Sequence, residues 1–184
     1  MERLPFAATP LSTTYDGIQR LPVTVLLDNV RSMYNIGSFF RTADACAAEA
    51  ILLAGIASTP ERNPKQIAKT ALGAEFTVPW RYAMDALDLL PEDTEIAAIE
   101  TTPRAVDLFD WQPRFPVCVL FGHEVDGIQP ALSARADVHV RLPMLGVKHS
   151  LNVATAGGIV LYELLRKYRN LMHHLTLPSH VIHE

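Results

Sequence analysis

Side chains that could perform chemistry gather in three short segments of the sequence, each containing glycine. The candidate catalytic residues in these segments are Asn35, Arg41, Glu124, Ser150 and Asn152. An amide can hold a sugar hydroxyl, a guanidinium can bind a phosphate through two hydrogen bonds, and a carboxylate can accept backbone amides. Taken singly, each residue also fits an ordinary role as a loop cap, a helix cap or a surface ion pair. Their combination is therefore the informative feature.

Each segment joins a hydrophobic run to a stretch with helical spacing. The three segments are residues 27–45 (LDNVRSMYNIGSFFRTADA), 119–132 (VLFGHEVDGIQPAL) and 140–165 (VRLPMLGVKHSLNVATAGGIVLYELL). Glu124 follows Gly122, and its carboxylate is expected either to fix the loop by accepting backbone amides or to take part in chemistry directly. Ser150 is placed to cap the last helix, whereas Asn152, early in that apolar helix, requires a hydrogen-bond partner.

The surrounding pattern predicts alternating strands and helices. Expected strands are residues 23–27, 50–54, 95–99, 117–121 and 138–142, and residues 76–78 are expected to be extended. Expected helices are residues 37–47, 63–69, 85–90 and 130–134, followed by a long helix that begins near Ser150. Such alternation is typical of a mostly parallel α/β sheet with helices on both faces, which binds ligands at the carboxyl ends of its strands.

Two features of the C-terminal part lead to further expectations. Gly157 and Gly158 interrupt the predicted last helix, where a glycine costs about 1 kcal/mol relative to alanine. Another backbone, of the sheet or of a second subunit, is therefore expected to approach them closely. The tail from His173 to Glu184 is expected to fray.

The composition predicts one globular domain, residues 1–184, with a core over about residues 21–169. The chain has 184 residues, of which 49% are hydrophobic and 20% charged. Cys46 and Cys118 lie in apolar runs and are predicted to be small core residues in a reducing compartment. Because neither a signal peptide nor a long apolar span is recognisable, a cytoplasmic location is expected.

Charge and missing motifs narrow the function classes. The net charge of −4 argues against broad, nonspecific nucleic-acid binding, because proteins that neutralise phosphates are usually basic. A local basic cluster, Arg62, Lys65 and Lys69, still allows a specific contact. The sequence has no GxGxxG after its first predicted strand, no phosphate loop, no GxSxG elbow and no paired histidine or cysteine spacing of a zinc site. A metal is therefore not expected.

In this order, the three segments resemble the motifs of the SpoU family of SPOUT methyltransferases: N…NxGxxxRTA, FGxExxGI and LPMxGxxxSLNVxxAxxIxLYE. The resemblance covers about residues 23–166. It implies a parallel α/β sheet whose C-terminal part forms a deep trefoil knot, a homodimer, and S-adenosylmethionine held in a bent shape largely by backbone groups. The implied cofactor-binding positions are Thr101, Gly122, Ile128, Leu142, Met144, Ser150 and Leu151.

The implied reaction is methyl transfer from S-adenosylmethionine to a ribose 2′-hydroxyl of RNA, with S-adenosylhomocysteine as product and no metal. By the family pattern Arg41 assists removal of the hydroxyl proton, while the other four candidate catalytic residues shape the pocket. Because a guanidinium is a poor base, binding of the adjacent phosphate is the alternative role of Arg41.

The expected RNA contacts are Arg41, Arg62, Lys65 and Lys69, and the short N-terminal extension favours tRNA over ribosomal RNA as substrate. Two other functions stay open at this point. One is a knotted RNA-binding protein without catalysis, against which the intact candidate catalytic residues argue. The other is an α/β enzyme that binds a small nucleotide or performs hydrolysis, which would suit the negative charge but lacks every phosphate-loop and nucleophile motif.

Overall fold

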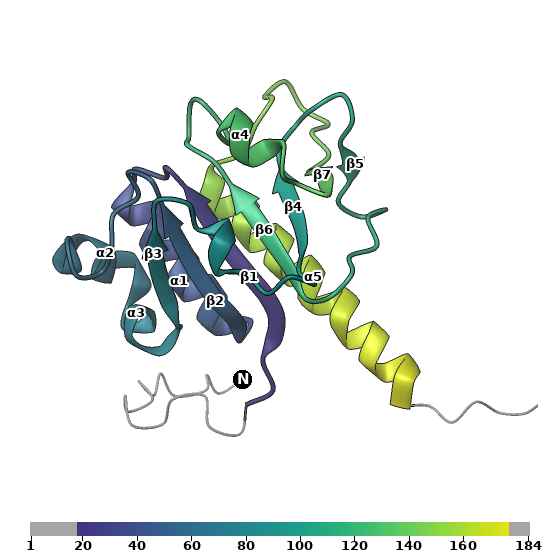
Figure 1. Ribbon diagram of the computed structural model, residues 1–184, viewed down its shortest axis with the longest axis horizontal. Coiled ribbons are helices and arrows are strands. Elements are labelled where there is room, and N and C mark those ends of the chain that lie inside the picture. Colours follow the sequence, from purple (N-terminus) through teal and green to yellow (C-terminus); the bar gives the residue numbers. More distant parts are fainter. Residues whose placement is uncertain (1–17, 177–184) are drawn as a thin grey trace, which may run out of the picture.

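The computed structural model describes residues 18–176, and a seven-stranded sheet forms the centre of the fold (Figure 1). The strands are β1 Leu21–Asp28, β2 Ala48–Ala54, β3 Trp80–Ala83, β4 Glu95–Ile99, β5 Val106–Asp107, β6 Val117–Phe121 and β7 Val138–Arg141. Their order across the sheet is β3-β2-β1-β6-β4-β7-β5, and every neighbouring pair is parallel. The predicted parallel α/β architecture is therefore confirmed.

Helices cover the two faces of this sheet unequally. The α-helices are α1 Met33–Ala45, α2 Pro64–Ala71, α3 Ala74–Thr77, α4 Pro130–Ser133 and α5 Val153–Thr176, and a 3-10 turn, η2, spans Leu87–Leu89. Phe39 of α1 and Leu161 of α5 pack with Val25 and Val119 on one face, where α5 passes behind the sheet in Figure 1. On the other face the short η2 and α4 pack over residues such as Leu120.

All five predicted strands are present, with ends that differ by two residues or fewer. The β6 strand matches its prediction at both ends, because residues 117–121 are an uninterrupted apolar run and all five are buried. Both cysteines are buried, as predicted for core residues. Burial raises the pKa of the Cys46 thiol to about 11 and also raises that of Cys118.

Several boundaries differ from the predictions. The first helix begins at Met33 rather than at Gly37, because the Ser32 hydroxyl caps it by accepting Asn35 N. The prediction of extended chain at residues 76–78 is wrong for Phe76 and Thr77, which form the last turn of α3. The predicted helix over residues 85–90 is reduced to the 3-10 turn.

The last helix also begins differently. Ser150 does not cap it. The Asn152 carboxamide oxygen accepts Ala154 N at 3.0 Å and Thr155 N at 3.2 Å. The helix continues past His173 to Thr176, and the rest of the tail lies outside the described residues.

Among the described residues, no backbone of the sheet approaches the two helical glycines, and the expected approach of a second subunit stays a prediction. A Cβ on Gly157 would lie 2.1 Å from the Phe39 ring, so a side chain of α1, not a backbone, occupies that space. A Cβ on Gly158 would meet no described atom within 4 Å. Within residues 18–176, no helix has the length and apolar character needed to cross a bilayer.

Candidate active site

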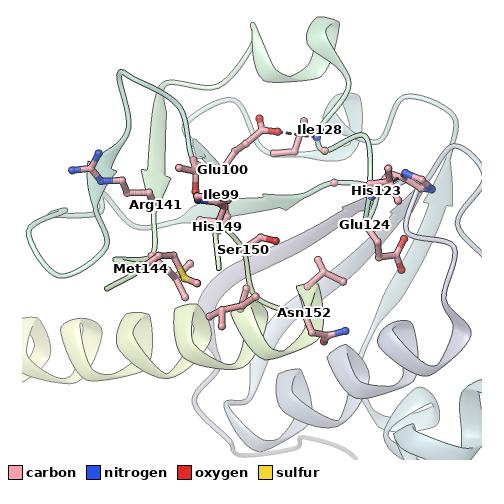
Figure 2. A pocket seen from close by; sticks show the side chains of 18 residues that line it. Ile99, Glu100, His123, Glu124, Ile128, Arg141, Met144, His149, Ser150 and Asn152 are labelled. Carbon is pink, nitrogen blue, oxygen red and sulfur yellow. Dashed lines mark hydrogen bonds between the residues drawn. The ribbon is translucent and has the colours of Figure 1, made fainter. Parts of the chain in front are cut away.

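A cleft of about 380 Å³ opens at the carboxyl ends of β4, β6 and β7 (Figure 2). These three strands are neighbours and parallel, so the loops that leave them meet at one edge of the sheet. The strand ends and loops contribute residues 99–101, 122–125, 127–128, 141–142 and 144, and the segment 149–153, with Ala156 of α5, closes the remaining side. The volume lies within the range of about 300–1,000 Å³ that is usual for small-molecule sites.

The cleft gathers residues that are far apart in the sequence. All seven predicted cofactor-binding residues line it: Thr101, Gly122, Ile128, Leu142, Met144, Ser150 and Leu151. Glu124 and Asn152 of the candidate catalytic set line it as well. Asn35 and Arg41 are absent from the lining, although Asn35 contacts two residues that belong to it.

Backbone forms one wall of the cleft, because the loop after β6 folds back tightly. His123 and Gly127 exchange two backbone hydrogen bonds of 3.0 Å. A Cβ on Gly122 would lie 2.1 Å from the carbonyl carbon of Gly127, so only glycine fits there. The Glu100 carboxylate accepts Ile128 N at 3.4 Å and thereby joins this loop to the one after β4. Sequence reasoning missed Glu100, which lies in none of the three motifs.

A chain of side-chain hydrogen bonds connects the three motif segments beside the cleft. The Asn35 amide nitrogen donates to Glu124 Oε1 at 3.0 Å, and the Asn152 amide nitrogen donates to Asn35 Oδ1 at 3.1 Å. Glu124 also accepts Ser32 N at 3.2 Å and Arg31 N at 3.3 Å. The carboxylate therefore fixes backbone amides, as expected for one of its two roles: it accepts the amide of Glu124 itself and two amides of the loop after β1.

These contacts keep Glu124 ionised. Partial burial opposes ionisation, but the backbone hydrogen bonds and the one from Asn35 outweigh it and lower the pKa of the Glu124 carboxyl. The side chain is thus a fixed negative charge at the edge of the cleft at neutral pH.

A second contact between the loops after β1 and β6 depends on Asp28, which is only 1% exposed. Its carboxylate accepts Gln129 N and Gln129 Nε2, both at 2.9 Å, and Asn29 Nδ2 at 2.8 Å. Sequence reasoning did not select Asp28 or Gln129. A buried carboxylate at the end of a strand requires such donors, so a charged residue closing an apolar run was the available signal.

The predicted RNA contacts lie outside the cleft. Arg41 is exposed on α1, six residues and therefore about 9 Å of helix rise beyond Asn35. Lys65 and Lys69 are exposed on α2, and Arg62 precedes that helix with its guanidinium 5.0 Å from the centre of the Tyr82 ring. The residues 18–176 contain no cluster of three histidine, cysteine or acidic side chains that could hold a metal ion.

The chain is similar to known proteins over most of its length. Residues 22–162 match the family described as "SpoU rRNA Methylase family". The chain is 32% identical over 168 residues to a 23S rRNA (guanosine-2′-O-)-methyltransferase, RlmB, of Ralstonia nicotianae, covering 87% of this chain and 65% of that protein. It is 31% identical over 152 residues to the tRNA (guanosine(18)-2′-O)-methyltransferase of Escherichia coli, covering 80% of this chain and 65% of that protein.

A solved structure extends the similarity to the fold. The SpoU methyltransferase AviRb from Streptomyces viridochromogenes, crystallised with the cofactor AdoMet, superposes with a TM-score of 0.72 and is 26% identical. The similarity covers 83% of this chain and 60% of that one. The chain thus spans less than two thirds of the length of each of these three proteins.

Proposed function

Because the chain belongs to the SpoU rRNA methylase family, we propose that it transfers a methyl group from S-adenosylmethionine to a ribose 2′-hydroxyl of RNA. One observation carries the proposal: a single cleft brings together all seven residues at which the resemblance to the family implies cofactor contacts. The proposal includes the trefoil knot around this cleft, a single catalytic domain, a homodimer and a cytoplasmic location.

The residues of the cleft fit S-adenosylmethionine. Ile128, Leu142 and Leu151 offer apolar walls for a flat adenine ring, and the backbone around Gly122 is open to polar contacts because no side chain covers it. When bound, the cofactor supplies an electrophilic methyl group on a sulfonium. The chain itself therefore has to hold the attacking hydroxyl in line and let its proton leave.

The side chains beside the cleft divide these tasks. Both oxygens of Glu124 are already engaged by donors, so we assign this residue to positioning Asn35 and the loop after β1. The hydrogen bond between Asn35 and Asn152 holds α1 and the start of α5 together beside the cleft. Ser150 lines the cleft and offers a hydroxyl to the bound groups.

Arg41 is assigned to the substrate phosphate. Its side chain is exposed, and a guanidinium remains protonated in proteins, so it binds an anion more readily than it accepts a proton. Holding the phosphate next to the target ribose would orient the 2′-hydroxyl toward the methyl group. Arg62, Lys65 and Lys69 extend this positive surface along the RNA.

The surface of α5 supports the homodimer. Ile159 is 38% exposed and Tyr162 is 54% exposed, and the three-residue spacing places both on one side of the helix. Leu151, just before the helix, is 40% exposed. Contact between two copies of the chain through this surface would remove these apolar side chains from water.

The proposal extends to the class of RNA that is methylated. The two relatives described above act, by their names, on 23S rRNA and on tRNA. We propose tRNA as the preferred substrate, because one of these two relatives is named for tRNA.

The test is incubation of the purified protein with radiolabelled S-adenosylmethionine and separate pools of tRNA and ribosomal RNA, followed by nuclease digestion. A labelled 2′-O-methyl nucleoside, formed faster from the tRNA pool, is the expected result. RNA binding without any labelled nucleoside would instead identify a noncatalytic RNA-binding protein and overturn the proposal. Label on a base rather than on a ribose would contradict the assigned reaction.

A further inference from the structure

Tyr34, the residue before Asn35 on α1, places an aromatic ring on the surface next to the candidate active site. Its side chain is 51% exposed, whereas the neighbouring Asn35 side chain bonds to Glu124 and Asn152 at the cleft. None of the motif-based assignments uses Tyr34. The ring is therefore available for contact with a molecule bound at the edge of the site.

The helices beneath Tyr34 hold it in a fixed place. Its carbonyl oxygen accepts the hydroxyls of Ser38 and Thr70, both at 2.9 Å. One turn on, α1 and α2 touch at Gly37, where a Cβ would lie 2.4 Å from the carbonyl oxygen of Ile67. The ring thus stands on two helices packed in close contact.

One cation contacts the ring and a second lies farther along α1. The Lys69 ammonium on α2 lies 3.5 Å from the Tyr34 hydroxyl and 5.8 Å from the centre of the ring. Arg41 lies seven residues after Tyr34, which places it two turns away on the same side of α1. The net charge of the chain is −4, so this positive surface is a local feature and not the average of the protein.

We propose that Tyr34 is a stacking platform for an unpaired base next to the methylated nucleotide, with Lys69 and Arg41 on the flanking phosphates. An exposed ring with cations on the same surface matches the alternation of bases and phosphates along a single strand, and single-stranded RNA is commonly bound by such stacking. A membrane or an acidic protein would satisfy the cations but would leave the ring without a planar partner. The inference rests on the proposed function and specifies that its RNA is unpaired at the site.

The experiment compares Tyr34→Ala and Tyr34→Phe with Phe76→Ala. Phe76 is the matched control, because it is an aromatic residue on α3 with 65% exposure that lies outside both the cleft and the basic surface. Affinity is measured for an RNA hairpin with an unpaired loop and for a fully paired duplex, together with KM for RNA, kcat and the affinity for S-adenosylhomocysteine. A 2-aminopurine base in the loop reports stacking directly through quenching of its fluorescence.

Tyr34→Ala should weaken hairpin binding about tenfold and raise KM for RNA, with duplex binding, S-adenosylhomocysteine affinity and molecular mass unchanged. Tyr34→Phe should retain both hairpin affinity and quenching. Equal losses with hairpin and duplex, loss of binding in Tyr34→Phe, or a change in oligomeric mass would each overturn the stacking role. The binding arms do not need turnover, so failure of the methyl-transfer proposal would be visible separately.

Discussion

The Asn152 carboxamide donates to the Asn35 carboxamide oxygen at 3.1 Å and so joins the start of α5 to the first turn of α1 across 117 residues of sequence. Asn35 in turn donates a hydrogen bond to Glu124 in the loop after β6. One residue from each motif is thus bonded to the next, and the geometry of the cleft edge depends on all three. The role of these hydrogen bonds can be tested by replacing the donor residues one at a time.

Asn35→Asp should loosen the cleft. The substitution replaces the amide that donates to Glu124 by a carboxylate, so two negative charges would face each other at about the present 3.0 Å. We expect at least a tenfold loss of S-adenosylhomocysteine affinity and a lower unfolding temperature. Adding Glu124→Gln should restore much of both, because the glutamine amide can donate to the new carboxylate. Failure of the second substitution to rescue the first would show that this hydrogen bond is unimportant.

The contribution of Glu124 to stability should depend on pH in a defined direction. Its carboxyl pKa is lowered from the usual 4.5 by hydrogen bonds formed on folding, so the stabilisation is fully present above pH 4.5 and is lost as the pH falls through the folded value. The difference in unfolding temperature between wild type and Glu124→Gln should therefore be constant from pH 7 to pH 5 and shrink in more acidic buffer. A difference that grows on acidification would contradict the assignment.

Arg41→Ala should abolish methyl transfer while leaving S-adenosylhomocysteine affinity nearly intact, because Arg41 lies outside the cleft lining. Arg20→Ala is the matched control, because this arginine lies at the amino ends of the strands, whereas the cleft lies at their carboxyl ends. Its guanidinium donates to the carbonyl oxygen of Glu49. Turnover is measured by label transfer and cofactor affinity by calorimetry. Normal turnover in Arg41→Ala would remove Arg41 from the site.

Reversing charge on α2 should weaken RNA binding without altering the cleft. Lys65→Glu combined with Lys69→Glu removes two candidate phosphate ligands, and the dependence of log affinity on log salt should decrease by about one for each phosphate that is no longer neutralised. The neutral pair Lys65→Gln and Lys69→Gln should lose less affinity than the reversed pair. An unchanged salt slope in both double variants would place the RNA elsewhere on the protein.

The sequence was sufficient for the main strands and for selecting residues that line one cleft. Long apolar runs such as residues 117–121 identify buried strands without ambiguity, and three ordered motifs identify positions that then line one cleft. The edge strands β3 and β5 were missed because they have four and two residues and show no fully buried position. Too few residues remain in such strands for an apolar pattern to stand out.

Other features were missed because they depend on tertiary contact. Leu72 and Gly73 both have positive φ, which ends α2 and lets a further turn begin at Ala74, where the sequence suggested extended chain. Ser150 and Asn152 are both common helix caps, and only the position of the α5 start distinguishes them. The space beside Gly157 is taken by the ring of Phe39, a contact between helices that periodicity does not reveal.

The most direct test of the central claim is a calorimetric titration of the purified, folded protein with S-adenosylhomocysteine, repeated with Thr101→Phe. Thr101 is exposed and lines the cleft, so a phenyl ring there should fill the site without disturbing the core. The account predicts saturable binding of one molecule per wild-type chain and its loss in the variant, with both proteins unfolding at similar temperatures. No binding by the wild type, or equal binding by both proteins, would contradict the proposal that this cleft holds the methyl donor.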